Sequence, residues 1–191
     1  MPPKIKTTKE DIINVALELV RTSGKDSLNA RSIAALLDCS TQPVFSNFSS
    51  MKELVRDTAI AAYKVYLDFI EREIKEKKYP EYKAMGIAYI RFANEEKELF
   101  KFLFMRDRTK ENTSNTPSDF DKSIELIMKA NNLSREDAHL MHLEIWSCVH
   151  GIATMAATSF LSFSEEIVST MLSDVYQGIR KYKSEGKNER N

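Results

Sequence analysis

The chain has 191 residues, of which 42% are hydrophobic and 29% charged, so it can bury a core and carries too many charges for a membrane protein. Its 28 basic and 28 acidic residues balance, so the net charge gives no indication of a nucleic-acid partner. Only five glycines and five prolines occur, which argues against a strand-and-turn architecture and against glycine-rich phosphate-binding loops. We therefore expect a helical globular protein of at most two folding units.

Three short segments open the chain. Apolar residues recur at three- and four-residue steps over 8–21, which predicts a helix capped by its first residue and stopped at Gly24. A second short helix is expected over 29–39. Ser40 is then the N-cap of a third helix, because Pro43 is tolerated only in the first helical turn, where amide groups lack an intrahelical partner.

Longer helical patterns follow. A helix over 51–77 has one apolar side and is long enough to join two modules. Further helices are expected over 80–93 and from Glu96 through Met105, the latter apolar almost all round. The stretch 106–118 has no large apolar residue and predicts a mobile loop. The remaining helices are predicted over 120–132, 134–161 and 164–183.

Neither a metal site nor a membrane segment is indicated. Cys39 and Cys148 lack Cys-x-x-Cys spacing, so we expect buried thiols. His139 and His142 lie three residues apart without a carboxylate-rich partner set, which makes them a weak metal candidate. No apolar run reaches the ~18 residues of a membrane span or matches a signal peptide. We expect a cytoplasmic protein without a cofactor or a metal.

The two short helices over 29–48 are the informative unit for function. Two such helices, joined by a short turn and the second starting with small polar residues, present a helix end to the major groove of DNA. Gln42 is the best base-reading candidate, since its amide can bond adenine through two hydrogen bonds. Val44, Phe45 and Phe48 are expected to anchor this helix inward. An ordinary helical hairpin in a bundle fits the spacing equally well.

Other residues would contact the DNA backbone. Small polar side chains at the helix caps, and Lys52 at the start of the long helix, are phosphate candidates. Lys4 and Lys6 in the N-terminal arm could reach the backbone or the minor groove, although a disordered terminus with ordinary lysines explains them equally well. The whole candidate set for DNA contact is Lys4, Lys6, Asn29, Ser40, Thr41, Gln42, Pro43, Phe45, Ser46, Asn47 and Lys52.

Over about residues 9–55 the chain resembles the N-terminal domain of the TetR/AcrR family of bacterial transcriptional regulators. Residues 98–105 and 146–151 are similar to the TetR-type C-terminal domain named for its Trp-His-Gly signature. The N-terminal resemblance is carried by Gly24, Leu28, Ala30, Ile33, Ala34, Leu37, Ser40, Val44, Phe45, Phe48 and Leu54.

The resemblance implies an all-α homodimer whose third helix enters the major groove and whose C-terminal domain dimerises and often holds a small-molecule effector. The expected fold is an N-terminal three-helix helix-turn-helix domain and a larger C-terminal helical bundle, about nine helices in total. The family usually has tyrosine at Phe45, lysine at Met51 and Gly-Thr at residues 42–43, and these departures concern the operator and not the fold. The expected boundaries are 1–50 for the arm and DNA-binding domain, 51–77 for the connecting helix, and 78–191 for the ligand-binding and dimerisation domain.

Two residue sets are expected to serve the C-terminal domain. Apolar cavities with a few polar groups bind small ligands, although aromatic and methionine residues at helical spacing are more often plain core. The candidate effector cavity is lined by Phe92, Phe100, Phe104, Met141, Trp146 and His150. A dimer interface in the last two helices is implied by the resemblance and would include Ala153, Ala156, Ala157, Met171, Val175 and Ile179.

The leading hypothesis is a dimeric DNA-binding regulator, a repressor relieved by a small-molecule effector, with double-stranded operator DNA and a second copy as partners. The alternative is a helical ligand-binding or adaptor protein with a degenerate helix-turn-helix. An enzyme is least supported, because no Ser-His-Asp, Cys-His or paired-carboxylate constellation can be assembled. Residues 1–56 carry eight basic and six acidic residues, so DNA affinity is expected to depend on a few placed contacts.

Overall fold

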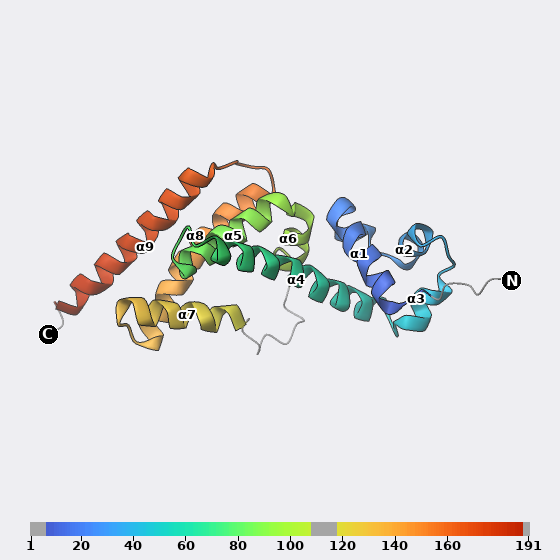
Figure 1. Cartoon of the computed structure of the whole chain (residues 1–191), viewed down its shortest axis with the longest axis horizontal. Helices are drawn as coiled ribbons and strands as arrows, with labels where there is room; N and C mark the ends of the chain where they lie inside the picture. The colour runs from blue at the N-terminus through green and yellow to red at the C-terminus, as the bar shows by residue number, and fades with distance from the viewer. Residues whose placement is uncertain (1–6, 108–117, 189–191) are drawn as a thin grey trace. The chain divides into compact units, whose positions relative to one another are not determined.

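The chain folds into α-helices, as the sequence predicts. The computed structural model describes residues 7–107 and 118–188 (Figure 1), and these ranges hold no strand and no helix long and apolar enough to cross a membrane. Lys4, Lys6 and most of the predicted loop over 106–118 lie outside the described residues. The described helices are α1 (Lys9–Ser23), α2 (Ala30–Leu36), α3 (Gln42–Asn47), α4 (Met51–Glu76), α5 (Glu81–Glu95), α6 (Lys97–Phe104), α7 (Ser118–Asn131), α8 (Arg135–Ala157) and α9 (Glu165–Asn188).

The chain divides into two compact units, which we describe separately. The first unit comprises residues 1–68 and 96–106, and the second comprises residues 69–95 and 107–191. The long helix α4 therefore begins in the first unit and ends in the second. The expected boundaries placed everything after residue 77 in one domain, whereas α6 groups with the N-terminal helices.

In the first unit, local signals fix both ends of α1. Oγ1 of Thr8 accepts from N of Asp11 at 3.1 Å, and the Asp11 carboxylate accepts from N of Thr8 at 2.9 Å, which completes a capping box. The helix ends at Gly24, whose φ of 75° is a conformation that glycine adopts without strain. The apolar stripes of α1 to α4 meet in a core that includes Ile12, Ala16, Val20, Ile33, Val44, Phe48 and Leu54.

Helix α6 belongs to this unit through one apolar side. The expectation that it is apolar almost all round is wrong, because Lys97, Glu98 and Lys101 form a polar side that is only half-buried. The helix packs against α1, and Leu99 and Phe100 are fully buried. Nε of Arg21 in α1 donates to Oε2 of Glu96, the N-cap of α6, at 2.9 Å. These contacts with α1 place α6 in the first unit, although α5, which precedes it in the chain, belongs to the second.

Helix α5 is the centre of the second unit and contacts α7, α8 and α9. Gly86 allows a close approach of these helices, because a Cβ at this position would lie 3.3 Å from Cδ1 of Leu172 and 3.5 Å from Cγ2 of Val149. Any larger residue would require the α9 side chain to move. The core of this unit is thus built around α5, with residues buried on both of its sides.

The predicted end of α8 at Leu161 is wrong, since the helix ends at Ala157. Ser159 has a left-handed φ of 56°, which ends the helical run. Phe160 is 75% exposed, so the apolar pattern continues beyond the helix without a buried partner. Conversely, α9 continues to Asn188, five residues beyond the predicted end.

Candidate functional site

The first candidate site is the exposed face of α3. Val44 and Phe48, four residues apart on one face, are only 1% and 2% exposed and fix this short helix to the core. Gln42 and Ser46, on another face, are exposed. Both side chains are accessible to solvent. Gln42 is the first residue of α3, and Ser46 lies one turn further along the helix.

Phe45 is not an inward anchor as predicted, because its side chain is 58% exposed. It follows Val44 directly, and neighbouring residues on a helix point in directions about 100° apart, so both cannot face the core of such a short helix. Asn47 faces inward instead. Its Nδ2 donates to the backbone O of Pro43 at 2.8 Å and to O of Thr7 at 3.4 Å, so this amide is engaged within the unit.

The remaining DNA-contact candidates differ in how free their polar groups are. Oδ1 of Asn29 caps α2 by accepting from N of Arg31 and N of Ser32 at 3.1 and 3.0 Å. Ser40 is exposed, and Thr41 and Pro43 are half-buried. The predicted N-cap at Ser40 is wrong by one residue, since Thr41 is the N-cap of α3 and makes no side-chain capping hydrogen bond.

Lysine and arginine side chains near α3 also divide into free and engaged groups. Lys52 is exposed, and so is Arg31, a residue that sequence analysis missed although it directly follows the first residue of α2. Neither forms an ion pair with another described residue. Both are positioned as free cations on the unit that carries α3.

Lys9, by contrast, is engaged. Its Nζ lies 3.2 Å from Oε1 of Glu53 and 2.7 Å from Oδ2 of Asp57, which ties α1 to α4. Hydrogen bonds to Asp57 and Glu53 raise the pKa of Lys9. Hydrogen bonds from Ser49, with a further one from Lys9, lower the pKa of Glu53 to about 2. This clamp holds the junction that follows α3.

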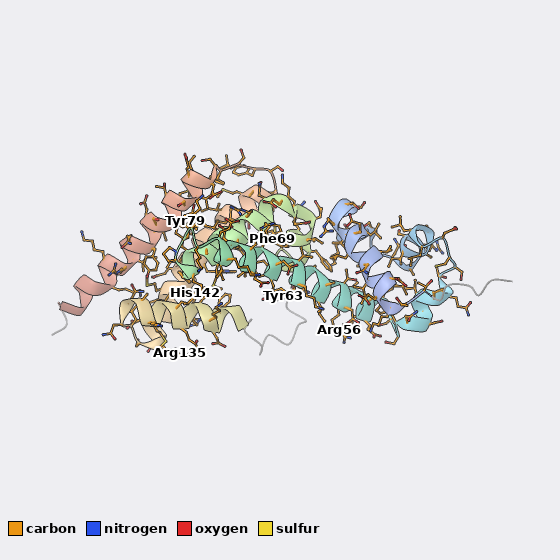
Figure 2. The ribbon with its side chains drawn as sticks, in the orientation of Figure 1. Arg56, Tyr63, Phe69, Tyr79, Arg135 and His142 are labelled. Carbon is orange, nitrogen blue, oxygen red and sulfur yellow. The ribbon has the colours of Figure 1, made fainter. Side chains whose placement is uncertain are left out.

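The second candidate site is a cluster of aromatic and histidine side chains in the second unit, which we call the aromatic cluster. Oη of Tyr82 lies 2.9 Å from Nδ1 of His142, and Oη of Tyr89 lies 2.9 Å from Nδ1 of His150. The Trp146 ring is stacked on His150 at 4.9 Å between centroids. The members of the aromatic cluster are Tyr82, Tyr89, Phe120, His142 (Figure 2), Trp146 and His150.

Burial keeps the aromatic cluster uncharged at neutral pH. It lowers the pKa of His142 to about 4, with a contribution from His139, and it lowers the pKa of His150. Burial also raises the pKa of the Tyr82 and Tyr89 hydroxyls. Nε2 of His142 is buried and has no hydrogen-bond partner among the described residues, so the cluster presents one unused polar atom in apolar surroundings.

The expected effector set is divided by the structure. Trp146 and His150 are in contact, and Phe92 and Met141 are fully buried in the second unit. Phe100 and Phe104 lie in the first unit, where their rings are 5.3 Å apart. Sequence analysis missed four members of the aromatic cluster, although His142, Trp146 and His150 repeat at four-residue steps on α8 and so share a face. The missed members are Tyr82, Tyr89, Phe120 and His142.

The expected dimer residues also have two environments. Ala153, Ala156 and Ala157 of α8 are at most 6% exposed, so they contact their own chain. Met171, Val175 and Ile179 of α9 are half-buried. Larger apolar side chains are exposed on the same two helices, namely Leu140, Leu143 and Ile167.

We expect His142 to make the protein less stable as the pH falls. Its pKa is about 4 in the folded chain and about 6.5 in an unfolded one. Between these values only the unfolded state binds the proton, so the free energy of unfolding falls by up to about 3 kcal/mol from this group as the pH drops from 6.5 to 4. Urea unfolding followed by circular dichroism measures this loss.

His142→Gln should remove that component, and His139→Gln, at an exposed site on the same helix, should retain it. The assignment is wrong if both variants lose stability on acidification as steeply as the wild type.

Comparisons with known proteins bear on both units. The family described as "Tetracyclin repressor-like, C-terminal domain" matches residues 82–174. A solved structure of a protein with unknown function from Rhodococcus sp. RHA1 has a TM-score of 0.72 at 20% identity, covering 93% of this chain and 98% of that one. A putative transcriptional regulator TetR family protein from Vibrio parahaemolyticus has a TM-score of 0.62 at 14% identity, covering 88% and 96%. A comparison with curated proteins finds no match.

Proposed function

We propose that this chain, whose residues 82–174 match the tetracycline repressor-like C-terminal domain, is a TetR-family protein: a dimeric DNA-binding transcriptional regulator, a repressor relieved by a small-molecule effector. The family match supports a role in transcription regulation. The specific assignments of the operator contacts, the dimer surface and the effector site are our inferences from side-chain positions in the two units.

The observation that carries the proposal is the division of α3 into two faces. Val44 and Phe48 fix the helix to its core, while Gln42 and Ser46 are exposed beside it. We infer that the Gln42 side-chain amide recognises an adenine by forming two hydrogen bonds, with the N6 and N7 atoms of that base. The exposed ring of Phe45 lies on this helix as well, and it lacks the hydroxyl with which a tyrosine would reach a phosphate.

Free cations next to α3 would supply the phosphate contacts. Lys52 and Arg31 are exposed and unpaired among the described residues, whereas Lys9 is held by two carboxylates. We therefore assign phosphate contacts to Lys52 and Arg31, with additional contacts from the N-terminal arm. Few cations are involved, so binding should depend on two copies acting together.

For dimerisation we propose a surface on α8 and α9. Leu140, Leu143 and Ile167 are 50%, 38% and 52% exposed in the single chain, and apolar side chains of this size gain by burial against a partner. The alanines of α8 would support this surface from inside. Sedimentation equilibrium at micromolar concentration should give a dimer.

For the effector we propose the aromatic cluster as the recognition site. Its groups are uncharged at neutral pH, and Nε2 of His142 is the unused polar atom, so an uncharged planar molecule with one hydrogen-bonding group is the expected class. Trp146 is the only tryptophan of the chain. Its fluorescence therefore reports binding at this site directly.

The test of the regulator function is a mobility-shift titration on the promoter DNA beside the protein's own gene. If each subunit of a dimer neutralises two phosphates, affinity should fall about 100-fold between 50 and 200 mM salt. A random duplex of the same length is the control and should bind far more weakly. Absence of a shift on promoter DNA at low salt would contradict the proposal.

An adaptor with a degenerate helix-turn-helix is the second candidate function. The exposed phenylalanine on α3 and the near-neutral charge of residues 1–56 favour it. Such a protein would show no salt-sensitive binding to DNA, while Trp146 fluorescence would still respond to a ligand. The two measurements together therefore separate the two functions.

A further inference from the structure

A separate group of polar side chains lies in the second unit, where Lys83 of α5 reaches α9. Its Nζ donates to Oγ of Ser169 and to Oγ of Ser173, both at 2.8 Å. The two serines are four residues apart, so their hydroxyls lie on one face of α9, one turn apart. Nζ also lies 4.8 Å from the ring centroid of Tyr79, which Figure 2 labels. The ammonium is therefore held in place from two helices and an aromatic face.

The ammonium of Lys83 has no carboxylate partner among the described residues, although its side chain is half-buried. Burial is the cause of its lowered pKa, and no acidic group opposes that shift. Other lysines of the unit differ, because Lys122 lies 2.7 Å from Oε1 of Glu81 and Lys78 is paired with Glu165. A partly dehydrated cation without a counter-ion is unusual.

Three acidic residues of α9 lie near Ser169 and Ser173 in sequence, namely Glu165, Glu166 and Asp174. Neither Glu166 nor Asp174 is among the ion pairs of the described residues, and Glu165 is already engaged. It binds Lys78, Tyr79 and Arg91. Its carboxylate lies one helical turn before Ser169 and forms its contacts with these three residues, not with Lys83. The charge of Lys83 thus stays uncompensated by the described residues.

The serine hydroxyls are also incompletely used. Each Oγ accepts from Lys83, so its own proton is still free to donate, and the described residues offer that proton no acceptor. The two hydroxyl protons therefore have no acceptor among the described residues, and they lie beside an ammonium whose charge no carboxylate of those residues balances. Gly86, one turn further along α5, lets the helices pack closely beside them, so the group has firm support.

We propose that Lys83, Ser169 and Ser173 form a binding site for an oxyanion, the carboxylate or phosphate group of a small molecule. Two oxygens of the anion accept from the two hydroxyls, and the ammonium neutralises its charge. The inference goes beyond the proposed function, because it requires neither DNA nor the aromatic cluster.

Isothermal titration calorimetry of the full chain tests the site, with inorganic phosphate and acetate as separate probes and chloride balancing the ionic strength. We expect wild-type binding of at least one probe in roughly the millimolar range. Lys83→Gln and the double variant Ser169→Ala/Ser173→Ala should each weaken it by about tenfold or more. Binding of acetate indicates a carboxylate ligand, and binding of phosphate alone indicates a phosphorylated one.

The control is Lys129→Gln, which removes an exposed lysine of α7 and should bind the probe as the wild type does. The double serine variant keeps every charge, so it tests the site even if Lys83→Gln unfolds. No binding by the wild type, or equal binding by all variants, overturns the proposal. The proposal is also overturned if the wild type binds no probe and Lys83→Gln converts a dimer into monomers. In that case Lys83 would pair with a carboxylate of a second copy and not with a small molecule.

Discussion

Replacing Gln42 and Lys52 together by alanine is expected to weaken operator binding by at least about 100-fold. A glutamine bonded to adenine through two hydrogen bonds contributes about 1–3 kcal/mol, and a dimer makes this contact twice. Loss of Lys52 removes a phosphate contact from each subunit as well. Both side chains are exposed, so the fold should be unaffected, and titration of the footprinted operator in a mobility-shift assay measures the change.

The single variants should separate the two roles. Gln42→Ala should reduce discrimination at one base pair of each half-site, whereas Lys52→Ala should weaken all sequences alike and reduce the salt dependence. A matched control is Gln177→Ala/Lys129→Ala, which removes an exposed amide and an exposed lysine from the second unit. This variant should bind as the wild type does.

Unchanged binding by Gln42→Ala/Lys52→Ala would refute the assignment of these contacts. If Lys52→Ala weakens binding and Gln42→Ala does not, α3 would still enter the groove, but the bases would be contacted by its other exposed residues, Phe45 and Ser46. A complete absence of binding by the wild type would instead contradict the regulator function itself. The three results lead to different conclusions.

The sequence predicted the helices well because their signals are local. The capping pair Thr8 and Asp11, the stop at Gly24 and the confinement of Pro43 to a first turn depend on neighbours within four residues. The start of α4 and its length also agree with the prediction over 51–77. Apolar periodicity predicted the end of α8 less well, because the apolar residues that follow Ala157, such as Phe160, are exposed and not packed in a core.

The sites were less predictable because they depend on residues far apart in the chain. Tyr82 and His142 are 60 residues apart, and nothing local in the sequence indicates their contact. Phe45 was wrongly predicted for a different reason. An aromatic residue within an apolar pattern suggests burial, but α3 is too short to bury both Phe45 and its neighbour Val44. Tertiary geometry decides both cases.

A buried carboxylate on α4 is the feature that sequence analysis did not anticipate. Glu73 is 1% exposed, and Nη1 of Arg91 in α5 lies 2.7 Å from its Oε2. Nη2 of Arg91 also lies 3.1 Å from Oε2 of Glu165. Neither Glu73 oxygen has a directed hydrogen bond from the described residues. The charge of Arg91 is therefore the main compensation for burying Glu73 within the second unit.

Replacing Arg91 by methionine is expected to destabilise the protein by about 3–5 kcal/mol at neutral pH, because removing one partner leaves a buried charge unpaired. The double variant Glu73→Met/Arg91→Met should recover most of this loss, since apolar side chains of similar size can replace such a pair. Arg72→Met is the control. Its guanidinium is exposed and lies 3.9 Å from Glu95, so it should cost less than about 1 kcal/mol.

The loss should also depend on pH. Burial already raises the pKa of Glu73, and the charge of Arg91 opposes that rise, so the pKa in Arg91→Met should be higher still. The folded variant then binds a proton that the unfolded chain releases above about pH 4.5, and its deficit should shrink as the pH falls from 7 towards 5. Urea unfolding at both pH values measures this, and a deficit that stays constant would mean that Arg91 acts through packing alone.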